Sequence, residues 1–350
     1  MGRQIIWILV LLAALRPSPG WAKGRCQEAS AKAKLVWDEV KSPNRHPFYT
    51  EKNPWGVKRP GPLAVDGDTL YIPDFRPPRE DRPRFLPQIH RICLRTGEHE
   101  VYQLPASGQI GGLVVLDGGR LLGVLKESAP DADGGELTFS GLQTLFSFRS
   151  DTGEYRELLK DQSFFGFTRL DDRVYVYHCA SCANTKDAFL VVFSAKTGQQ
   201  TGTCQLHGPD SDQKCRGLRG ELDRLQGSGG ADGNPSQSQE VSYLAEDGRK
   251  QILLRREREG TGDFYFHPLP SGEIMILYQS KDQIHTGVGY EAFLLGPGGE
   301  KLGRVYLSGF WGDFKIQYDA QSRSLTRTCL DPVGPLRVYR ETLGLSPWKD

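Results

Sequence analysis

Hydrophobic and polar residues alternate along most of the chain in short runs, and pairs of these runs flank small-residue turns. Residues 91–104, 145–159 and 189–202 each contain two alternating runs around a turn with glycine. Alternation with a period of two indicates strands, and glycine tolerates positive φ, so each segment predicts a β-hairpin. The turn glycines of this series recur about every 50 residues: Gly97, Gly153, Gly198, Gly248 and Gly299.

A second hairpin series lies between these copies, with turns near residues 67, 118, 172, 272 and 321. Two hairpins in each period make a four-stranded blade, and the missing turn near 221 indicates a degraded fourth copy. The sequence therefore predicts an all-β protein, a six-bladed β-propeller over residues 23–350. Blades are expected to start near residues 62, 110, 164, 213, 263 and 312, with 226–239 as a flexible loop. A β-sandwich explains the short strands but not the repeat.

The two ends of the repeat predict how the ring closes. The chain stops where the second hairpin of the last blade should turn, so that blade lacks an outer strand. Residues 34–40 (KLVWDEV) form a lone strand-like run before the first full blade. Because an open sheet edge is a liability, we expect this N-terminal strand to complete the last blade.

The hairpin turns at 94–100, 149–155 and 194–200 (LRTGEHE, RSDTGEY, SAKTGQQ) resemble those of NHL-type, YWTD-type and quinoprotein-type propeller repeats. The resemblance implies a propeller over nearly the whole mature chain. Quinoprotein repeats typically carry a tryptophan in each blade, whereas Trp311 is the only tryptophan between residues 56 and 347. This argues against a quinone enzyme, and the resemblance supplies no catalytic residue.

The N-terminus predicts export. A basic start, the apolar run 5–15 and a small-residue site ending at Ala22 are typical of a secretory signal peptide. The apolar run is shorter than the 18 or so residues that a membrane span needs, so no integral membrane segment is expected after cleavage. We therefore expect residues 1–22 to be removed and the mature chain to be secreted or periplasmic.

Charge and composition limit the partners. The 44 lysines and arginines balance 43 aspartates and glutamates, which gives no electrostatic reason to expect nucleic-acid binding. The 41 glycines and 22 prolines agree with a turn-rich all-β fold. We expect a monomer that binds a protein or carbohydrate ligand.

Loop length predicts which face of the ring carries the functional surface. In each blade the first-to-second and third-to-fourth strand turns are tight, whereas the second-to-third connections are long, as in 73–88, 126–141, 178–188 and 279–290. Loops longer than closure requires usually carry function or are disordered, so we take the face with these loops as the candidate functional surface. The first of them holds Arg76 and Arg79 among four arginines, which suggests either a basic arm for an anionic partner or a solvated insertion.

Seven cysteines in an exported protein permit disulfides and leave one thiol over. His178 precedes a C-x-x-C pair, Cys179 and Cys182, which fits a local disulfide, half of a zinc site or a redox dithiol. The other candidate pairs are Cys204 with Cys215 and Cys26 with Cys329, which leaves Cys93 as a buried free thiol.

Two aspartates recur at neighbouring blade starts, in Gly262-Asp263-Phe264 and Gly312-Asp313-Phe314. They could hold a cation such as calcium or perform acid–base chemistry at the channel mouth, or they could cap turns through their own backbone. No cofactor is expected, with calcium the one ion left open. The candidate ligand-binding residues are Asp263, Asp313, Trp311, His178, Arg76 and Arg79.

These observations favour an exported binding or interaction propeller that uses the loop-rich face and the channel mouth. The alternative is a channel-based hydrolase or lyase that uses carboxylates or a bound cation on a small or sugar-like substrate. No nucleophile elbow, phosphate-binding loop or zinc-protease motif is present, and no catalytic residue is predicted.

Overall fold

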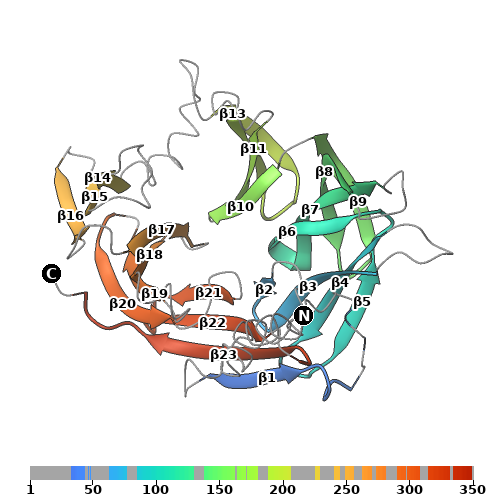
Figure 1. The fold of residues 1–350 in the computed structure, drawn as a ribbon, viewed down its shortest axis with the longest axis horizontal. Coiled ribbons are helices and arrows are strands. Elements are labelled where there is room, and N and C mark those ends of the chain that lie inside the picture. Colours follow the sequence, from blue (N-terminus) through green and yellow to red (C-terminus); the bar gives the residue numbers. More distant parts are fainter. Residues whose placement is uncertain are drawn as a thin grey trace, which may run out of the picture.

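A computed structural model describes residues 33–43, 46, 48, 63–76, 85–129, 138–161, 164–170, 172–179, 188–205, 225–228, 240–244, 249–255, 262–269, 273–280, 290–296, 298–307, 314–331 and 334–348. These residues form six antiparallel sheets that follow one another around a ring (Figure 1). The predicted all-β propeller is confirmed. Within the described part, the helical structure is one short 3-10 turn, Asp117–Gly119 (η2).

We number the sheets as blades one to six in chain order, and each blade is listed with its strands from the centre outward. Blade one has β2 (Ala64–Asp66), β3 (Thr69–Arg76), β4 (Leu86–Cys93) and β5 (His99–Gln103). Blade two has β6 (Gln109–Val115), β7 (Arg120–Ala129), β8 (Thr138–Arg149) and β9 (Glu154–Asp161). Blade three has β10 (Phe164–Leu170), β11 (Arg173–Cys179), β12 (Ala188–Ser194) and β13 (Gln200–Gln205).

The other three blades complete the ring. Blade four has β14 (Leu225–Ser228), β15 (Glu240–Leu244) and β16 (Lys250–Arg255). Blade five has β17 (Gly262–Pro268), β18 (Ile274–Ser280), β19 (Tyr290–Leu295) and β20 (Lys301–Leu307). Blade six has β21 (Phe314–Asp319), β22 (Ser324–Asp331), β23 (Arg337–Gly344) and, outermost, β1 (Lys34–Asp38).

The prediction of six blades with a degraded fourth copy is corrected in its blade count. Five four-stranded blades are present, and the described residues give blade four three strands. The predicted loop 226–239 is also shorter at its start, because residues 225–228 form β14 and pair with β15. The sequence of residues 216–239 is rich in glycine and polar residues, which are depleted in strands.

The repeated Thr-Gly turn joins the two outer strands of blades one, two and three. In blade one the N–H of Gly97 donates to the carbonyl of Cys93 (2.8 Å), and the Oγ1 of Thr96 accepts the N–H of Glu98 (3.3 Å). Gly97 has a φ of 78°, a conformation that favours glycine. The same two bonds recur at Gly153–Arg149 with Glu154–Thr152, and at Gly198–Ser194 with Gln199–Thr197.

Apolar clusters between neighbouring blades form the core, because middle strands are buried on both faces. Tyr71 and Ile89 of blade one pack with Ile110 and Phe146 of blade two. Similar clusters join blades two and three, four and five, and five and six. Full burial of one large apolar side chain contributes about 1.5–3 kcal/mol, so these interfaces supply most of the stabilisation of the ring.

The N-terminal strand closes the ring as predicted. β1 pairs antiparallel with β23, with Lys34 opposite Arg340 and Trp37 opposite Val338, and lies at the rim of the molecule (Figure 1). Trp37 is buried and packs with Leu70 and Ile72 of blade one and with Leu336 of blade six. We call this interface between blades one and six, with β1 included, the seam.

The C-terminal tail binds to blade five. Ser346 and Arg304 of β20 exchange both backbone hydrogen bonds (2.8 and 2.9 Å). Trp348 packs against Phe293 with ring centroids 5.1 Å apart, and the ammonium group of Lys301 lies 5.3 Å from the same indole ring. The tail therefore links blade six to the outer edge of blade five. No helix within the described residues has the length and apolar character needed to cross a bilayer.

Candidate functional site

The face that carries the tight turns, here the turn face, is occupied by contacts between neighbouring blades. Arg340 of blade six donates to the carboxylate of Asp68 (2.6 Å) and to the carbonyl of Gly67 (2.7 Å) in the first turn of blade one. Three other arginines donate across blade boundaries to carbonyl groups: Arg120 to Thr197, Arg169 to Val115 and Arg323 to Leu302.

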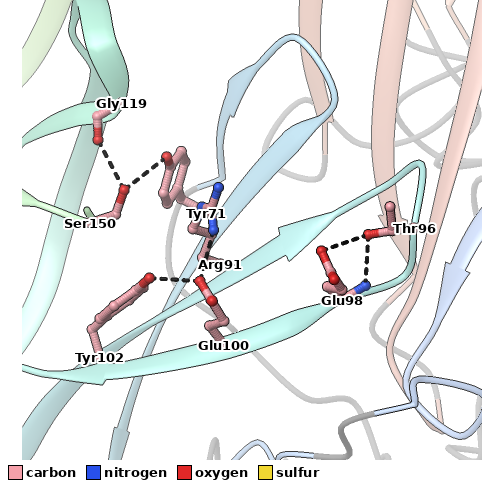
Figure 2. Close-up of polar contacts among 8 residues, drawn as sticks. All are labelled: Tyr71, Arg91, Thr96, Glu98, Glu100, Tyr102, Gly119 and Ser150. Atoms are coloured by element: carbon pink, nitrogen blue, oxygen red, sulfur yellow. Dashed lines mark hydrogen bonds and ion pairs between the residues drawn. The ribbon is translucent and has the colours of Figure 1, made fainter.

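Blades one and two are joined on this face by a hydroxyl pair, which Figure 2 shows. Tyr71 and Ser150 lie 3.4 Å apart, and the Ser150 hydroxyl donates to the carbonyl of Gly119 (3.3 Å). Nearby, Glu100 accepts from Arg91 (2.8 Å) and from Tyr102 (2.7 Å) within blade one. Polar groups of the turn face therefore hold the ring together.

The opposite face, here the loop face, carries the long second-to-third connections. In blade one, β3 ends and β4 begins there, and Phe75 and Phe85 are in edge contact with ring centroids 5.0 Å apart. Arg76, the last residue of β3, is half-buried and donates from Nε to the Oε1 of Gln88 (3.3 Å). The predicted basic arm begins at this residue.

A buried polar network extends from Arg76 into the seam. Gln88 donates from Nε2 to the Oδ2 of Asp74 (3.1 Å), and the same nitrogen lies 3.1 Å from the Nε2 of His90. The Nδ1 of His90 lies 2.7 Å from the Nε2 of His99. Asp74, Gln88, His90 and His99 are each no more than 3% exposed, so the network is excluded from solvent. We call these four residues the seam network.

One assignment of the histidine tautomers matches the contact with Gln88. Because Arg76 donates to the amide oxygen of Gln88, the amide nitrogen faces Asp74 and His90 and can donate to both. In this assignment, His90 accepts at Nε2 and carries its proton on Nδ1, which donates to His99. His99 accepts at Nε2 and carries its own proton on Nδ1, a buried atom with no partner among the described residues.

Burial keeps both rings neutral. Desolvation lowers the pKa of His90, although hydrogen bonding and attraction from Asp74 oppose this shift. Desolvation, followed by repulsion from His90 and His46, lowers the pKa of His99 to about 3. Asp74 opposes the shift at His90 because its carboxylate lies 3.3 Å from the Nε2 of that ring, whereas His99 contacts His90 instead of a carboxylate.

Aromatic rings cover the network. Phe48 stacks on His90 with ring centroids 3.9 Å apart, and Trp37 of β1 meets His99 edge-on at 5.5 Å. His46 also meets His99 edge-on, at 5.1 Å. The N-terminal strand and the segment after it therefore form one wall around the two histidines.

The predicted site residues fall into three groups. Arg76 lies beside the seam network, and His178 is buried on β11 with its ring 4.3 Å from that of Phe189. Asp263 is the second residue of strand β17. Arg79, Trp311 and Asp313 lie outside the described residues, so the predicted channel-mouth group stays a prediction.

Sequence reasoning missed the seam network. Its signal is the pair Gln88 and His90, which occupy alternate positions on β4 where apolar residues would face the neighbouring blade. Within the described residues, no group of three or more histidine, cysteine or acidic side chains has the geometry of a metal site.

The cysteine predictions have mixed outcomes. Cys93 is free, as expected, but half-buried rather than buried, because it ends β4 beside the turn. Cys329 on β22 is buried and disulfide-bonded, and its predicted partner Cys26 lies outside the described residues. The predicted pair Cys204 and Cys215 is untested, because Cys215 lies outside that part of the chain.

The pair Cys179 and Cys182 gives a testable prediction. Cys179 ends β11 and Cys182 lies outside the described residues. A ring closed over two intervening residues constrains little chain, so C179S/C182S should lower stability by only about 1 kcal/mol. Peptide mapping without reductant should recover the two residues joined. Ready alkylation of both thiols, or one zinc per chain, would contradict the disulfide.

Comparisons with known proteins do not assign a family. No family model matches the chain, and no curated protein matches it. The resemblance to NHL-type and YWTD-type repeats therefore stays a prediction.

Three solved structures illustrate the similarity in architecture. The β-propeller domain of the Trilobed protease from Pyrococcus furiosus is 8% identical, with 82% of this chain and 84% of that chain covered and a TM-score of 0.39. The acylaminoacyl peptidase of Pyrococcus horikoshii is 8% identical, with 82% and 45% covered and a TM-score of 0.42, so this chain spans less than half of that enzyme. An oligogalacturonate lyase in complex with manganese is 16% identical, with 82% and 77% covered and a TM-score of 0.40.

Proposed function

We propose that the protein is an exported binding propeller that holds an anionic carbohydrate on its loop face. The observation that carries the proposal is a difference between the two faces: polar contacts between blades occupy the turn face, whereas the long connections lie on the loop face. Arginines of the turn face donate to carbonyls of neighbouring blades and thereby hold the ring. This leaves the loop face, with its long connections, for a ligand.

The basic arm of blade one supplies the charge. Arg76, Arg79, Arg82 and Arg84 lie within nine residues, against two acids, Glu80 and Asp81. Guanidinium groups bind carboxylate and sulfate in two-pronged hydrogen bonds, and five prolines in residues 73–88 limit the conformational entropy lost on binding. The arm starts from a rigid base, because Arg76 is anchored on Gln88.

The test is a binding titration with heparin and alginate as anionic probes and dextran as the neutral control. The variant R79Q/R82Q/R84Q should weaken binding of an anionic probe by about 10-fold or more, because three charge-assisted contacts are lost. The matched control R95Q/R156Q/R173Q removes three exposed arginines elsewhere and should bind normally.

Two results would overturn the proposal. Equal affinity of both triple variants would remove the basic arm from the site. Cleavage of the probe, abolished by D263N/D313N, would favour the channel-based hydrolase or lyase instead. One observation bears on that alternative: burial lowers the pKa of Lys315, which lies on the innermost strand β21 two residues after Asp313 in sequence.

A further inference from the structure

The seam network lies where the ring is closed by hydrogen bonds rather than by continuous chain. Asp74 is on β3, Gln88 and His90 are on β4, and His99 is on β5, all in blade one. Across the interface lie Trp37 of β1 and the apolar side chains Leu330, Leu336 and Val338 of blade six. Any charge that forms on the histidines is therefore placed against apolar groups.

With these tautomers, neither histidine has a ring nitrogen that can accept an additional proton without a change in its hydrogen bond. The Nε2 of His90 accepts from Gln88, and the Nε2 of His99 accepts from His90. Protonation of His99 at Nε2 would set two N–H groups against each other across 2.7 Å, so that hydrogen bond must break. Protonation of His90 at Nε2 exchanges the bond from Gln88 for an ion pair with Asp74, 3.3 Å away.

The charged groups around the network do not offset positive charges on both His90 and His99. Asp74 faces His90, and Glu39, just after β1, attracts it more weakly. The Oε2 of Glu39 already accepts the N–H of Leu336 (2.8 Å). His46 repels both rings when it is charged. On blade six, the charged groups pair with one another or with blade one: Asp38 with Arg337, and Arg340 with Asp68.

We propose that the seam network is an acid-sensitive latch, in which proton uptake by the His90–His99 pair releases the N-terminal strand from the ring. In the closed ring the pair is neutral and its single shared hydrogen bond is intact. In the open ring both imidazoles are solvated and each takes up a proton from water near its ordinary pKa of 6.5. The proposal does not depend on the identity of the ligand.

The direction of the pH effect follows from the lowered pKa values. A histidine whose pKa is lower in the closed state stabilises that state above its open-state pKa, and this contribution is lost as the pH falls below about 6.5. Between pH 7.5 and 5.5, each such histidine should raise the equilibrium constant for opening about 10-fold. The pair together should raise it by up to about 100-fold.

Hydrogen exchange read by peptide mass spectrometry measures the opening. We expect peptides covering 34–38 and 337–340 to exchange at least 10-fold faster at pH 5.5 than at pH 7.5, after correction for intrinsic rates. Strands β7 and β8, away from the seam, provide the internal reference. The variant H90F/H99F should lose this acceleration, whereas H178F, which removes a buried histidine from blade three, should keep it.

Two results would overturn the latch. One is seam exchange that accelerates no more than β7 and β8, and the other is acceleration that persists in H90F/H99F. If that variant does not fold, exchange at the imidazole C2–H of the unmodified protein decides the question. Titration of His90 and His99 near 6.5 in the native state would contradict the proposal, and values well below 6.5 would support it.

Discussion

Deleting residues 23–42 lowers the melting temperature by about 10 °C, which is the largest effect that the closure of the ring predicts. The deletion removes β1, exposes the outer edge of β23 and leaves a void where Trp37 packs between blades one and six. Removal of a buried tryptophan side chain alone costs about 3–5 kcal/mol. For a protein of this size, 1 kcal/mol corresponds to roughly 2–4 °C.

Differential scanning calorimetry of the mature chain and of two deletions measures this effect. Deleting only residues 23–32 keeps β1 and is the matched control, so it should melt close to the parent. If the longer deletion also melts within a degree or two of the parent, the N-terminal strand does not stabilise the ring.

Substituting Glu341 by Gln should give the second large effect, a loss of about 3–5 kcal/mol in the free energy of unfolding. Arg327 and Glu341 pair across β22 and β23 at 2.7 Å, and their side chains are 1% and 3% exposed. Burial lowers the pKa of Arg327, and attraction to Glu341 opposes that shift. Without the carboxylate, the guanidinium group stays charged inside the blade and its desolvation is no longer offset.

Urea denaturation of three variants tests this expectation. R327M/E341L removes both charges and should recover most of the stability lost in E341Q, because apolar replacements remove the desolvation cost. E291Q breaks the exposed pair of Arg304 and Glu291 and should cost less than about 1 kcal/mol. A similar small loss in E341Q would show that the buried pair contributes little.

The repeat and the closing strand could be predicted from the sequence because each depends on local chemistry. The Thr-Gly turns form their two hydrogen bonds within six residues, as at Cys93–Glu98. In the sequence pattern, the run at 34–40 had no partner strand and the last blade had no outer strand. β1 occupies that outer position and pairs with β23. Blade four was less predictable, because few strand-forming residues mark its inner edge.

The seam network could not be predicted, because its residues come from the three strands β3, β4 and β5. They face β1, which lies about 50 residues earlier in the sequence. Period-two alternation shows that Gln88 and His90 share a side of β4, but not which blade covers that side. Only the ring geometry brings Trp37 against His99. The arginine contacts of the turn face were missed for the same reason, since they join blades through backbone carbonyls.

Closure by the first strand also determines the order of assembly. The Leu336 amide and the Glu39 carboxylate that it binds are 297 residues apart in sequence, so β1 is synthesised long before its partner strand β23 exists. Until β1 pairs with it, β23 presents a free edge that fits the β1 of any copy of the chain. At high concentration, two molecules refolding together can exchange these strands and form a dimer that keeps every native pairing. Slow, dilute refolding gives the intramolecular strand the advantage.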